Sequence, residues 1–300
     1  MSDGAATARR MWTLFEPVHV ISYFAQPPRA AFEQAGLRGY WRGYFAGRAA
    51  PIGRVGAAPV LAAFFSFAPA MVTRALPAVW ELISPEQALA VRQAGAVAAL
   101  RELLDLGETA LVPADVAEAA GRLSDTASGL DVAGRTLGAS NAALPVPDEP
   151  LARLWHAATL LREHRGDGHI AALVAADLDG PEALALRAGL DVAATQASRE
   201  PGMWRREELQ RARGWTDDEW DAAASRLADR GLLQPSGAVT AAGAQLHREI
   251  EAVTDAAAAR QWAGQSDSEA DKLAALLLPI ARACATVLPF PNPVGVPAPR

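Results

Sequence analysis

The most polar stretch of the chain is REHRGDGH, residues 162–169. Within it His164, Asp167 and His169 follow an H-x-x-D-x-H pattern, and Glu163 lies directly before the first histidine. A histidine with a carboxylate partner can transfer protons in catalysis, or it can bind a metal ion that the carboxylate supports. If the protein is an enzyme, we predict that these four residues carry its chemistry.

A structural interpretation of the same stretch stays open. In it, Gly166 breaks a helix that begins near Leu151, and Asp167 caps the helix that follows. Arginine–carboxylate pairs then hold the turn together. The sequence predicts no metal site and identifies no cofactor. It also has no Walker loop, dinucleotide fingerprint, nucleophile elbow or HExxH motif, which disfavours the common nucleotide-dependent, hydrolytic and zinc-protease chemistries.

A second candidate site is basic and aromatic. Residues 34–80 contain no acidic residue, and the segment GYWRGYFAGRAAPIG within them interleaves aromatic residues with arginines. Such a segment suits an anionic ligand or a nucleic-acid backbone. The alternative is that its aromatic residues are core and its arginines pair with acids of the C-terminal half. We predict that Trp41, Tyr44 and Arg48 bind a small anionic or aromatic molecule together with His19, for which a packed, hydrogen-bonded role is the alternative.

Residues 213–262 predict the elements of a winged helix. Thr216 caps a helix with Glu219 as its capping-box partner, and Gly231 ends that helix. Residues 232–240 then form two short extended segments around a Pro-Ser-Gly turn, and Thr240 caps a long helix. This order is similar to the recognition helix and β wing of a MarR-like winged helix.

Four arginines of this region are the predicted DNA-binding residues: Arg205, Arg206, Arg226 and Arg230. Residues 213–233 nevertheless hold five acidic residues against three arginines. Phosphate contacts supply most of the non-specific affinity for DNA, so a net negative reading helix is poorly suited to duplex DNA.

Composition narrows the function classes. The chain has 300 residues, 51% of them hydrophobic, and a net charge of −6, which disfavours an indiscriminate binder of nucleic acids or membrane surfaces. The single cysteine, Cys284, excludes an internal disulfide and suggests a buried thiol in a cytoplasmic protein. We interpret the charge-free run over residues 55–73 as a buried helix, not a membrane span, and see no signal peptide.

Three domains are predicted in a mainly α, tandem winged-helix architecture with a short β wing. The proline cluster at residues 145–150 separates a helical domain or degenerate winged helix, residues 1–147, from a winged-helix domain, residues 148–264. Residues 265–300 form a C-terminal helix and an extended, proline-rich tail that packs on the body. The echo of SPEQALAVRQAG in GPEALALRAG favours a tandem plan.

Seven segments spread over most of the chain resemble an actinobacterial helix-turn-helix family often described as SalK-like. They are GYFAGRAAPIG, FFSFAP, ALPAVW, LLREHRGDGHIAAL, RGWTDDEW, RGLL and IEAVTD. The resemblance implies a mostly helical protein with winged-helix units, frequently described as a regulator. It transfers no catalytic residue.

Two hypotheses follow. The first is a small-molecule-responsive regulator or DNA-binding module that binds duplex DNA as a monomer or a homodimer. The second is an enzyme or small-molecule-binding protein on a winged-helix scaffold that no longer reads DNA, with its site around residues 162–169.

Overall fold

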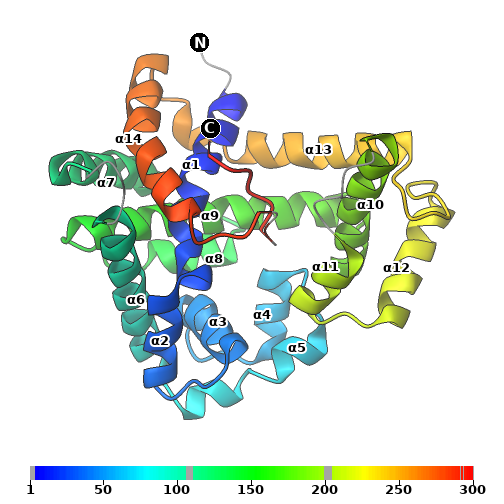
Figure 1. The fold of residues 1–300 in the computed structure, drawn as a ribbon, viewed down its shortest axis with the longest axis horizontal. Helices are drawn as coiled ribbons and strands as arrows, with labels where there is room; N and C mark the ends of the chain where they lie inside the picture. Colours follow the sequence, from blue (N-terminus) through cyan, green and yellow to red (C-terminus); the bar gives the residue numbers. More distant parts are fainter. Residues whose placement is uncertain (1–3, 106–110, 199–204, 291, 293, 300) are drawn as a thin grey trace.

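The computed structural model describes residues 4–105, 111–198, 205–290, 292 and 294–299, and these residues are mainly helical, as predicted (Figure 1). The α-helices are α1 (Gly4–Phe24), α2 (Gln26–Gln34), α3 (Tyr40–Ala49), α4 (Ala57–Phe64), α5 (Pro69–Thr73), α6 (Pro85–Asp105), α7 (Pro113–Ser128), α8 (Thr136–Ala142), α9 (Pro150–Ala175), α10 (Gly180–Ser198), α11 (Arg206–Arg213), α12 (Asp217–Asp229), α13 (Ala241–Ala257) and α14 (Asp267–Ala285). Three short 3-10 helices lie between them: η1 (Ala50–Ile52), η2 (Ala78–Glu81) and η3 (Arg260–Trp262).

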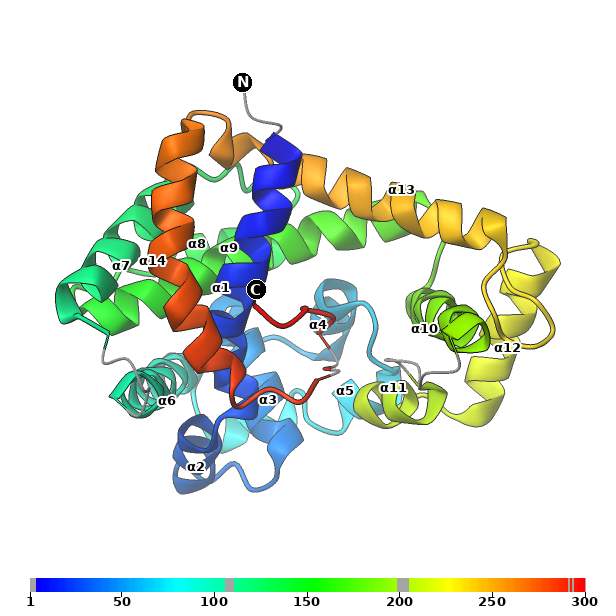
Figure 2. The ribbon, with the colours of Figure 1, turned by 45° about the horizontal axis from the view of Figure 1, so that its top comes forward.

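Helix α9 organises the molecule. Its 26 residues span about 39 Å at 1.5 Å per residue. It lies side by side with α13 along one edge of the molecule (Figures 1 and 2). The N-terminal helices and α14 gather at one end of this pair, and α10–α12 lie at the other (Figure 2). On the opposite edge α5 lies beside α11, and Ala68 N donates to Arg213 O at 2.8 Å, which is a second connection between the two ends of the molecule (Figure 2).

The main hydrophobic core does not divide at the proline cluster of residues 145–150. It combines α1, α6 and α7 with the first half of α9, including the buried Trp155 and Leu161, and with α14. Cys284 is buried in this core, as predicted. Because α9 closes the core of the N-terminal helices and then enters the core of α10–α12 through Leu173, the two predicted domains share one helix.

The apolar run over residues 55–73 does not form a single buried helix. It forms α4 and α5, with a break at Phe65, whose φ is +50°, and Pro69 begins the second helix. Val60, Phe64 and Phe67 are buried in a second core beneath α3. Among the described residues, no helix is both long enough and apolar enough to span a membrane.

The capping residues of α12 and α13 are where the sequence places them. Thr216 Oγ1 accepts a hydrogen bond from Glu219 N at 3.3 Å, and the Glu219 carboxylate accepts one from Thr216 N at 2.9 Å, which completes the capping box. Gly231 follows α12 with a φ of +70°. Thr240 Oγ1 accepts from Gly243 N at 3.1 Å and begins α13.

The expected β wing is reduced to one antiparallel bridge, between Leu233 and Val239, and no strand occurs in the described ranges. The two hydrogen bonds that flank this bridge are made, from Gln234 N to Ala238 O at 2.8 Å and from Thr240 N to Leu232 O at 3.0 Å, and the hairpin is short because α12 ends at Asp229 and α13 begins at Ala241. Val239 N points away from Leu233 and donates to Gly189 O of α10 at 2.9 Å, and a Cβ at Gly189 would lie 3.0 Å from Gly237 O. No second bridge occurs in the described part of residues 1–147, so the tandem winged-helix expectation has no wing to support it in that half.

The C-terminal tail packs on the body. Val296 is buried with Leu288 against Val20 of α1, and the Asn292 side chain donates to Val296 O at 2.9 Å. This tail brings Val294 to the edge of the cavities described below.

Candidate ligand-binding site

The segment of residues 162–169 is a continuous part of α9, so the predicted helix break at Gly166 is wrong. Asp167 does not cap the helix that is predicted to follow Gly166. Its carboxylate instead accepts a hydrogen bond at 2.8 Å from Gly138 N, in the first turn of α8. Gly168 serves packing, because it leaves room for the guanidinium of Arg135, which donates to His164 O at 2.5 Å. Tertiary contacts with α8 therefore keep helical a sequence whose glycines locally favour a break.

The helix separates the residues of the H-x-x-D-x-H pattern. His164 and His169 are five positions apart, which places them about 140° apart around an α-helix. The buried His164 contacts Asp131 O through Nε2 at 3.0 Å, whereas His169 Nδ1 lies 2.9 Å from Thr254 Oγ1 of α13. The structure does not bring the two histidines into one cavity, and no described group of histidine, cysteine and acidic side chains suits a metal ion.

The electrostatics of these side chains follow from burial. Burial lowers the pKa of both His164 and His169 to about 4, so both are neutral at pH 7. Burial raises the pKa of Asp167 to about 6. Each group is held by a different neighbouring element, as in a packed helix and not as in a catalytic cluster.

The residues of the second candidate site, by contrast, lie close together in the structure. Along α3, Tyr40, Tyr44 and Arg48 recur every four residues and lie along one side of the helix. Arg48 Nη1 donates to Tyr44 Oη at 3.3 Å, and the Tyr44 ring lies 4.9 Å from that of Tyr23 of α1 and 5.5 Å from that of Trp41 (centroid distances).

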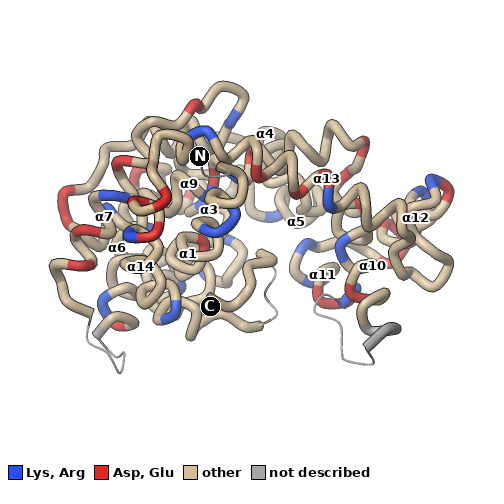
Figure 3. The backbone as a smooth tube through the Cα atoms, turned by 90° about the horizontal axis from the view of Figure 1, so that it is seen from above, with Lys and Arg blue, Asp and Glu red and all other residues tan. Residues whose placement is uncertain are grey.

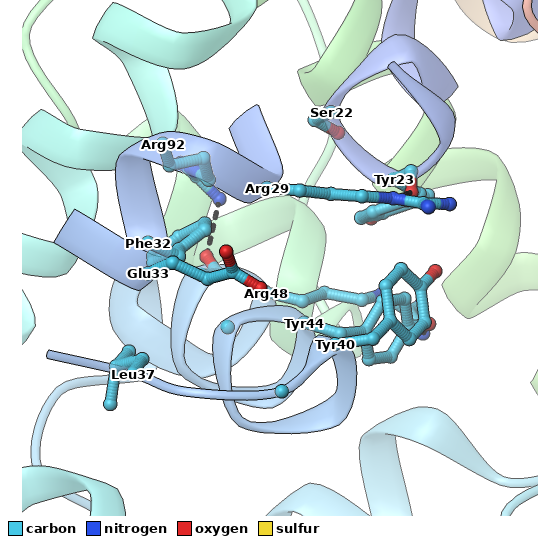
Figure 4. A pocket seen from close by; sticks show the side chains of 13 residues that line it. Ser22, Tyr23, Arg29, Phe32, Glu33, Leu37, Tyr40, Tyr44, Arg48 and Arg92 are labelled. Carbon is cyan, nitrogen blue, oxygen red and sulfur yellow. Dashed lines mark hydrogen bonds between the residues drawn. The ribbon is translucent and has the colours of Figure 1, made fainter. Parts of the chain in front are cut away.

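Two adjoining cavities lie against this face of α3. The first, of about 160 Å³, and the second, of about 270 Å³, have four residues in common: Tyr23, Arg29, Tyr40 and Tyr44. Figure 4 shows Arg29 stretched across the Tyr23 side and Arg48 passing behind Tyr40 and Tyr44. Arg92 of α6 and Phe32 of α2 lie at the opposite end of the first cavity (Figure 4).

The second cavity opens between α3 and α11. Trp41 and Phe67 line it from the N-terminal helices, and Arg213, the last residue of α11, lines it from the other side. The guanidinium of Arg213 lies 4.8 Å from the centroid of the Phe67 ring, and its Nε donates to Ser66 Oγ at 3.2 Å.

A buried ion network stands behind the first cavity. The Glu163 carboxylate accepts from Arg48 Nε and Nη2 at 3.0 and 3.1 Å and from Arg162 Nη1 at 2.7 Å. Arg162 Nε also contacts Glu16 at 3.3 Å. Burial opposes the charge of Arg48, but Glu163 outweighs it and raises the pKa of Arg48 well above its ordinary value. Glu163 thus holds Arg48, a residue of the cavity wall, and does not form a cluster with the predicted H-x-x-D-x-H residues.

His19 lies one layer behind the cavity wall. Its Nε2 is 2.9 Å from Tyr23 Oη, and its Nδ1 is 3.0 Å from Thr159 Oγ1. Burial, with Arg162 adding to it, lowers the pKa of His19 well below its usual value, so the ring is neutral. His19 therefore orients the Tyr23 hydroxyl and does not itself line either cavity.

Of the four predicted ligand-binding residues, Tyr44 and Arg48 line the first cavity, Tyr44 and Trp41 line the second, and His19 supports Tyr23. The sequence did not single out Arg92 and Arg213 as ligand-binding residues. An arginine inside the otherwise apolar pattern of α6 was the available signal for Arg92.

The predicted DNA-binding arginines are mostly engaged inside the α10–α12 region. Arg206 pairs with Asp217 and Asp221 at 2.9 and 2.5 Å. Arg226 pairs with acids of the α9–α10 connection and α10, namely Asp179 and Glu182.

Arg230 donates to backbone carbonyls of Ala176 and Asp177, and Arg205 is exposed. Figure 3 shows basic and acidic positions interleaved around α11 and α12. Arg226 of α12, and Arg230 directly after it, thus hold the helices together as well as facing solvent.

Comparison with known proteins gives one match. A family model described as a helix-turn-helix family matches residues 8–291, nearly the whole chain. No curated protein and no solved structure matches the chain.

Proposed function

Because the chain belongs to this helix-turn-helix family, we propose that it is a small-molecule-responsive, DNA-binding regulator that acts in the cytoplasm. The SalK-like resemblance and the MarR-like order of helix, reduced wing and helix over residues 213–262 support the same assignment. The ligand site that we assign is the pair of cavities against α3, and the DNA-binding element is α12.

The observation that carries the proposal is the position of the second cavity between the N-terminal helices and α11. Arg213 lines it, and the backbone on either side of this residue is anchored: Arg213 O accepts from Ala68 N at 2.8 Å, and Trp215 Nε1 donates to Ser66 O at 2.8 Å. Trp215 leads directly into α12. A bound molecule at this wall therefore contacts the segment that sets the position of the reading helix, which is what ligand response requires.

DNA binding at α12 requires phosphate oxygens to replace carboxylates that pair with its arginine. The side chain of Arg226 is 47% exposed, and of its two partners Asp179 is 51% exposed and Glu182 is 7% exposed, so phosphate oxygens can compete for the guanidinium on its Asp179 side. Exposed pairs contribute only about 0–1 kcal/mol, so exchanging an acid for a phosphate is feasible. The acids that remain nearby keep the affinity modest, and each neutralised phosphate makes the affinity more dependent on salt.

Fluorescence anisotropy with mixed-sequence duplex DNA tests the proposal. We expect binding at about 50 mM salt that weakens towards about 200 mM, with a slope of about 0.9 in log affinity against log salt for each neutralised phosphate. The double variant Arg226→Ala/Arg230→Ala lowers the slope by about 2. Arg122→Ala, an exposed arginine of α7 that also pairs with a carboxylate, is the matched control and leaves the slope unchanged. Absence of binding at 50 mM salt would overturn the DNA-binding part.

One observation favours a second candidate function. Arg206, Arg226 and Arg230 all have intramolecular partners, and the first turn of α12 carries three acidic residues. These features suit a ligand-binding protein or an enzyme that uses a helix-turn-helix scaffold without reading DNA. In that case the cavities bind a small molecule and the anisotropy experiment gives no salt-dependent binding.

A further inference from the structure

Arg92 is a buried cation that forms no ion pair with any acidic side chain in the described part of the chain. Its side chain reaches the first cavity from α6 and is 8% exposed. Nη1 donates to Gly47 O at 3.1 Å and Nη2 donates to Asn141 Oδ1 at 3.2 Å, and both acceptors are neutral. Nε has no hydrogen-bond partner among the described residues. A guanidinium carries five N–H donors, so Arg92 has unused donors, and its Cζ lies 5.1 Å from the centroid of the Trp155 ring.

Arg92 lies outside the ion network beside the cavity. In that network the buried carboxylates of Glu16 and Glu163 are hydrogen-bonded to Arg48 and Arg162. Neither carboxylate is hydrogen-bonded to Arg92. Burial lowers the pKa of Arg92 to about 10, and the group is still protonated at pH 7. An anion in the cavity would offset the cost of burying this charge.

Tyr23 can complete an anion site. Its hydroxyl lies 2.9 Å from Nε2 of the neutral His19, whose Nδ1 is bonded to Thr159. When Thr159 donates to Nδ1, the proton of His19 is on Nε2 and is donated to Tyr23, which frees the phenolic O–H to donate to a ligand. A bound anion stabilises this arrangement of the protons on Thr159, His19 and Tyr23.

The other walls are aromatic. The rings of Tyr40 and Tyr44 lie 6.0 Å apart, and Phe32 closes the end beside Arg92. A cavity of about 150 Å³ accommodates a benzene ring, and the first cavity, of about 160 Å³, is of this size. Among its described lining residues Glu33 is acidic and exposed, which favours a ligand with a single negative charge over a phosphate dianion.

We propose that the first cavity binds an aromatic carboxylate, with the carboxylate between the Arg92 guanidinium and the Tyr23 hydroxyl and the ring among the tyrosines. This inference rests on the proposed function in that it names the class of small molecule to which the regulator responds. A fused ring system extends along the wall that the two cavities share, towards Arg213.

Titration calorimetry with 2-naphthoate and its neutral analogue 2-naphthamide tests the inference. We expect the wild-type protein to bind the acid about 10- to 100-fold more tightly than the amide, as one charge-assisted hydrogen-bonding site predicts. Arg92→Met removes the preference by weakening the acid and leaving the amide unchanged. Arg101→Met, an exposed arginine on the same helix, is the matched control and retains the preference.

Tyr23→Phe is a second variant, which removes one hydroxyl and keeps the ring. It weakens the acid by a smaller factor than Arg92→Met and leaves the amide unchanged, so the inference stays testable if Arg92→Met does not fold. Equal binding of acid and amide, binding of neither, or an unchanged preference in both variants would overturn the inference.

Addition of 2-naphthoate to the DNA titration separates the inference from the proposed function. Binding of the acid that depends on Arg92, without any change in DNA affinity, supports the site and contradicts the regulator. A preference for the amide, with a change in DNA affinity on its binding, contradicts the site and supports the regulator.

Discussion

Residues 162–169 and residues 39–53 both carry side chains suited to chemistry, but the fold treats them in opposite ways. The first segment is contiguous and polar, and α9 sends His164 towards Asp131 and His169 towards Thr254. The second segment has aromatic residues and arginines four apart, and α3 presents Tyr44 and Arg48 to the same cavity. Residues of one helix therefore form a site when they are three or four positions apart, because these positions share a face. Residues that are merely close in sequence point in different directions around the helix axis.

Glu163 connects the two regions. It belongs to the polar segment of α9, yet its carboxylate is the counter-ion of Arg48 behind the cavity. The role of this residue is set by its partner in α3, 115 positions away.

The largest expected loss of stability comes from removing the negative charge of Glu163. Glu163→Gln leaves the guanidinium groups of Arg48 and Arg162 without their shared carboxylate, in a site where the Glu163 side chain is only 2% exposed. Breaking a buried pair on one side costs about 3–5 kcal/mol, so we expect a loss of that size in the free energy of unfolding, measured with urea.

Glu118→Gln is the matched control for that prediction. Glu118 pairs with Arg122 one turn away on α7, and its side chain is 51% exposed. The expected loss is below about 0.5 kcal/mol. Equal losses in the two variants would contradict the view that burial of the Arg48–Glu163 pair couples α9 to α3.

An intermediate effect is expected in mild acid. Burial, assisted by Arg92 at His156 and by Arg135 at His164, lowers the pKa of both histidines to about 4. Between their ordinary pKa of 6.5 and this value the unfolded chain binds more protons than the folded one, so stability falls as the pH is lowered through this window. Asp167 acts oppositely above its ordinary pKa of 3.8, because its pKa is raised to about 6 and the folded state takes up its proton first.

Urea unfolding at about pH 7.5 and about pH 5 measures this balance. We expect wild-type stability to drop between the two values, since several histidines act against one carboxyl group. His164→Asn lessens the drop, and Asp167→Asn steepens it. If the two variants change the drop in the same direction, the assignment of opposite roles to His164 and Asp167 fails.

The elements that the sequence predicts best are those fixed by local chemistry. The capping box of Thr216 and Glu219, the left-handed Gly231 and the cap at Thr240 each depend on residues within a few positions of one another. The cavity face of α3 is of the same kind, because Tyr44 and Arg48 are one helical turn apart. Local spacing is sufficient for such features.

The features that the sequence could not predict depend on distant partners. The main core joins α1 and α14, more than two hundred residues apart, and no local pattern marks that contact. The acids that engage Arg226, Asp179 and Glu182, lie more than forty positions away, and Val239 N of the wing finds its acceptor, Gly189 O, on α10. The position of Arg92 beside neutral acceptors and the Trp155 ring is likewise a property of the assembled cavity.

The smallest expected effect is that of a substitution at Gly166, in the part of α9 that carries His164 and His169 on different sides of the helix. In a continuous α9, a Cβ added at Gly166 would lie 3.7 Å from Arg162 Nη1 and 3.9 Å from Glu163 Oε2, which are ordinary contacts. Gly166→Ala should therefore stabilise the protein by about 1 kcal/mol in urea unfolding, because alanine favours a helix and restricts the unfolded chain.

Gly168→Ala, two positions along the same helix, is the control for that variant. Its added Cβ would lie 2.6 Å from Arg135 Nη1, and Arg135 donates to both His164 O and Ala257 O. Displacing this guanidinium cancels or reverses the helical gain. Destabilisation by Gly166→Ala would instead indicate a left-handed break at residue 166, and with it a turn that could bring His164 and His169 together.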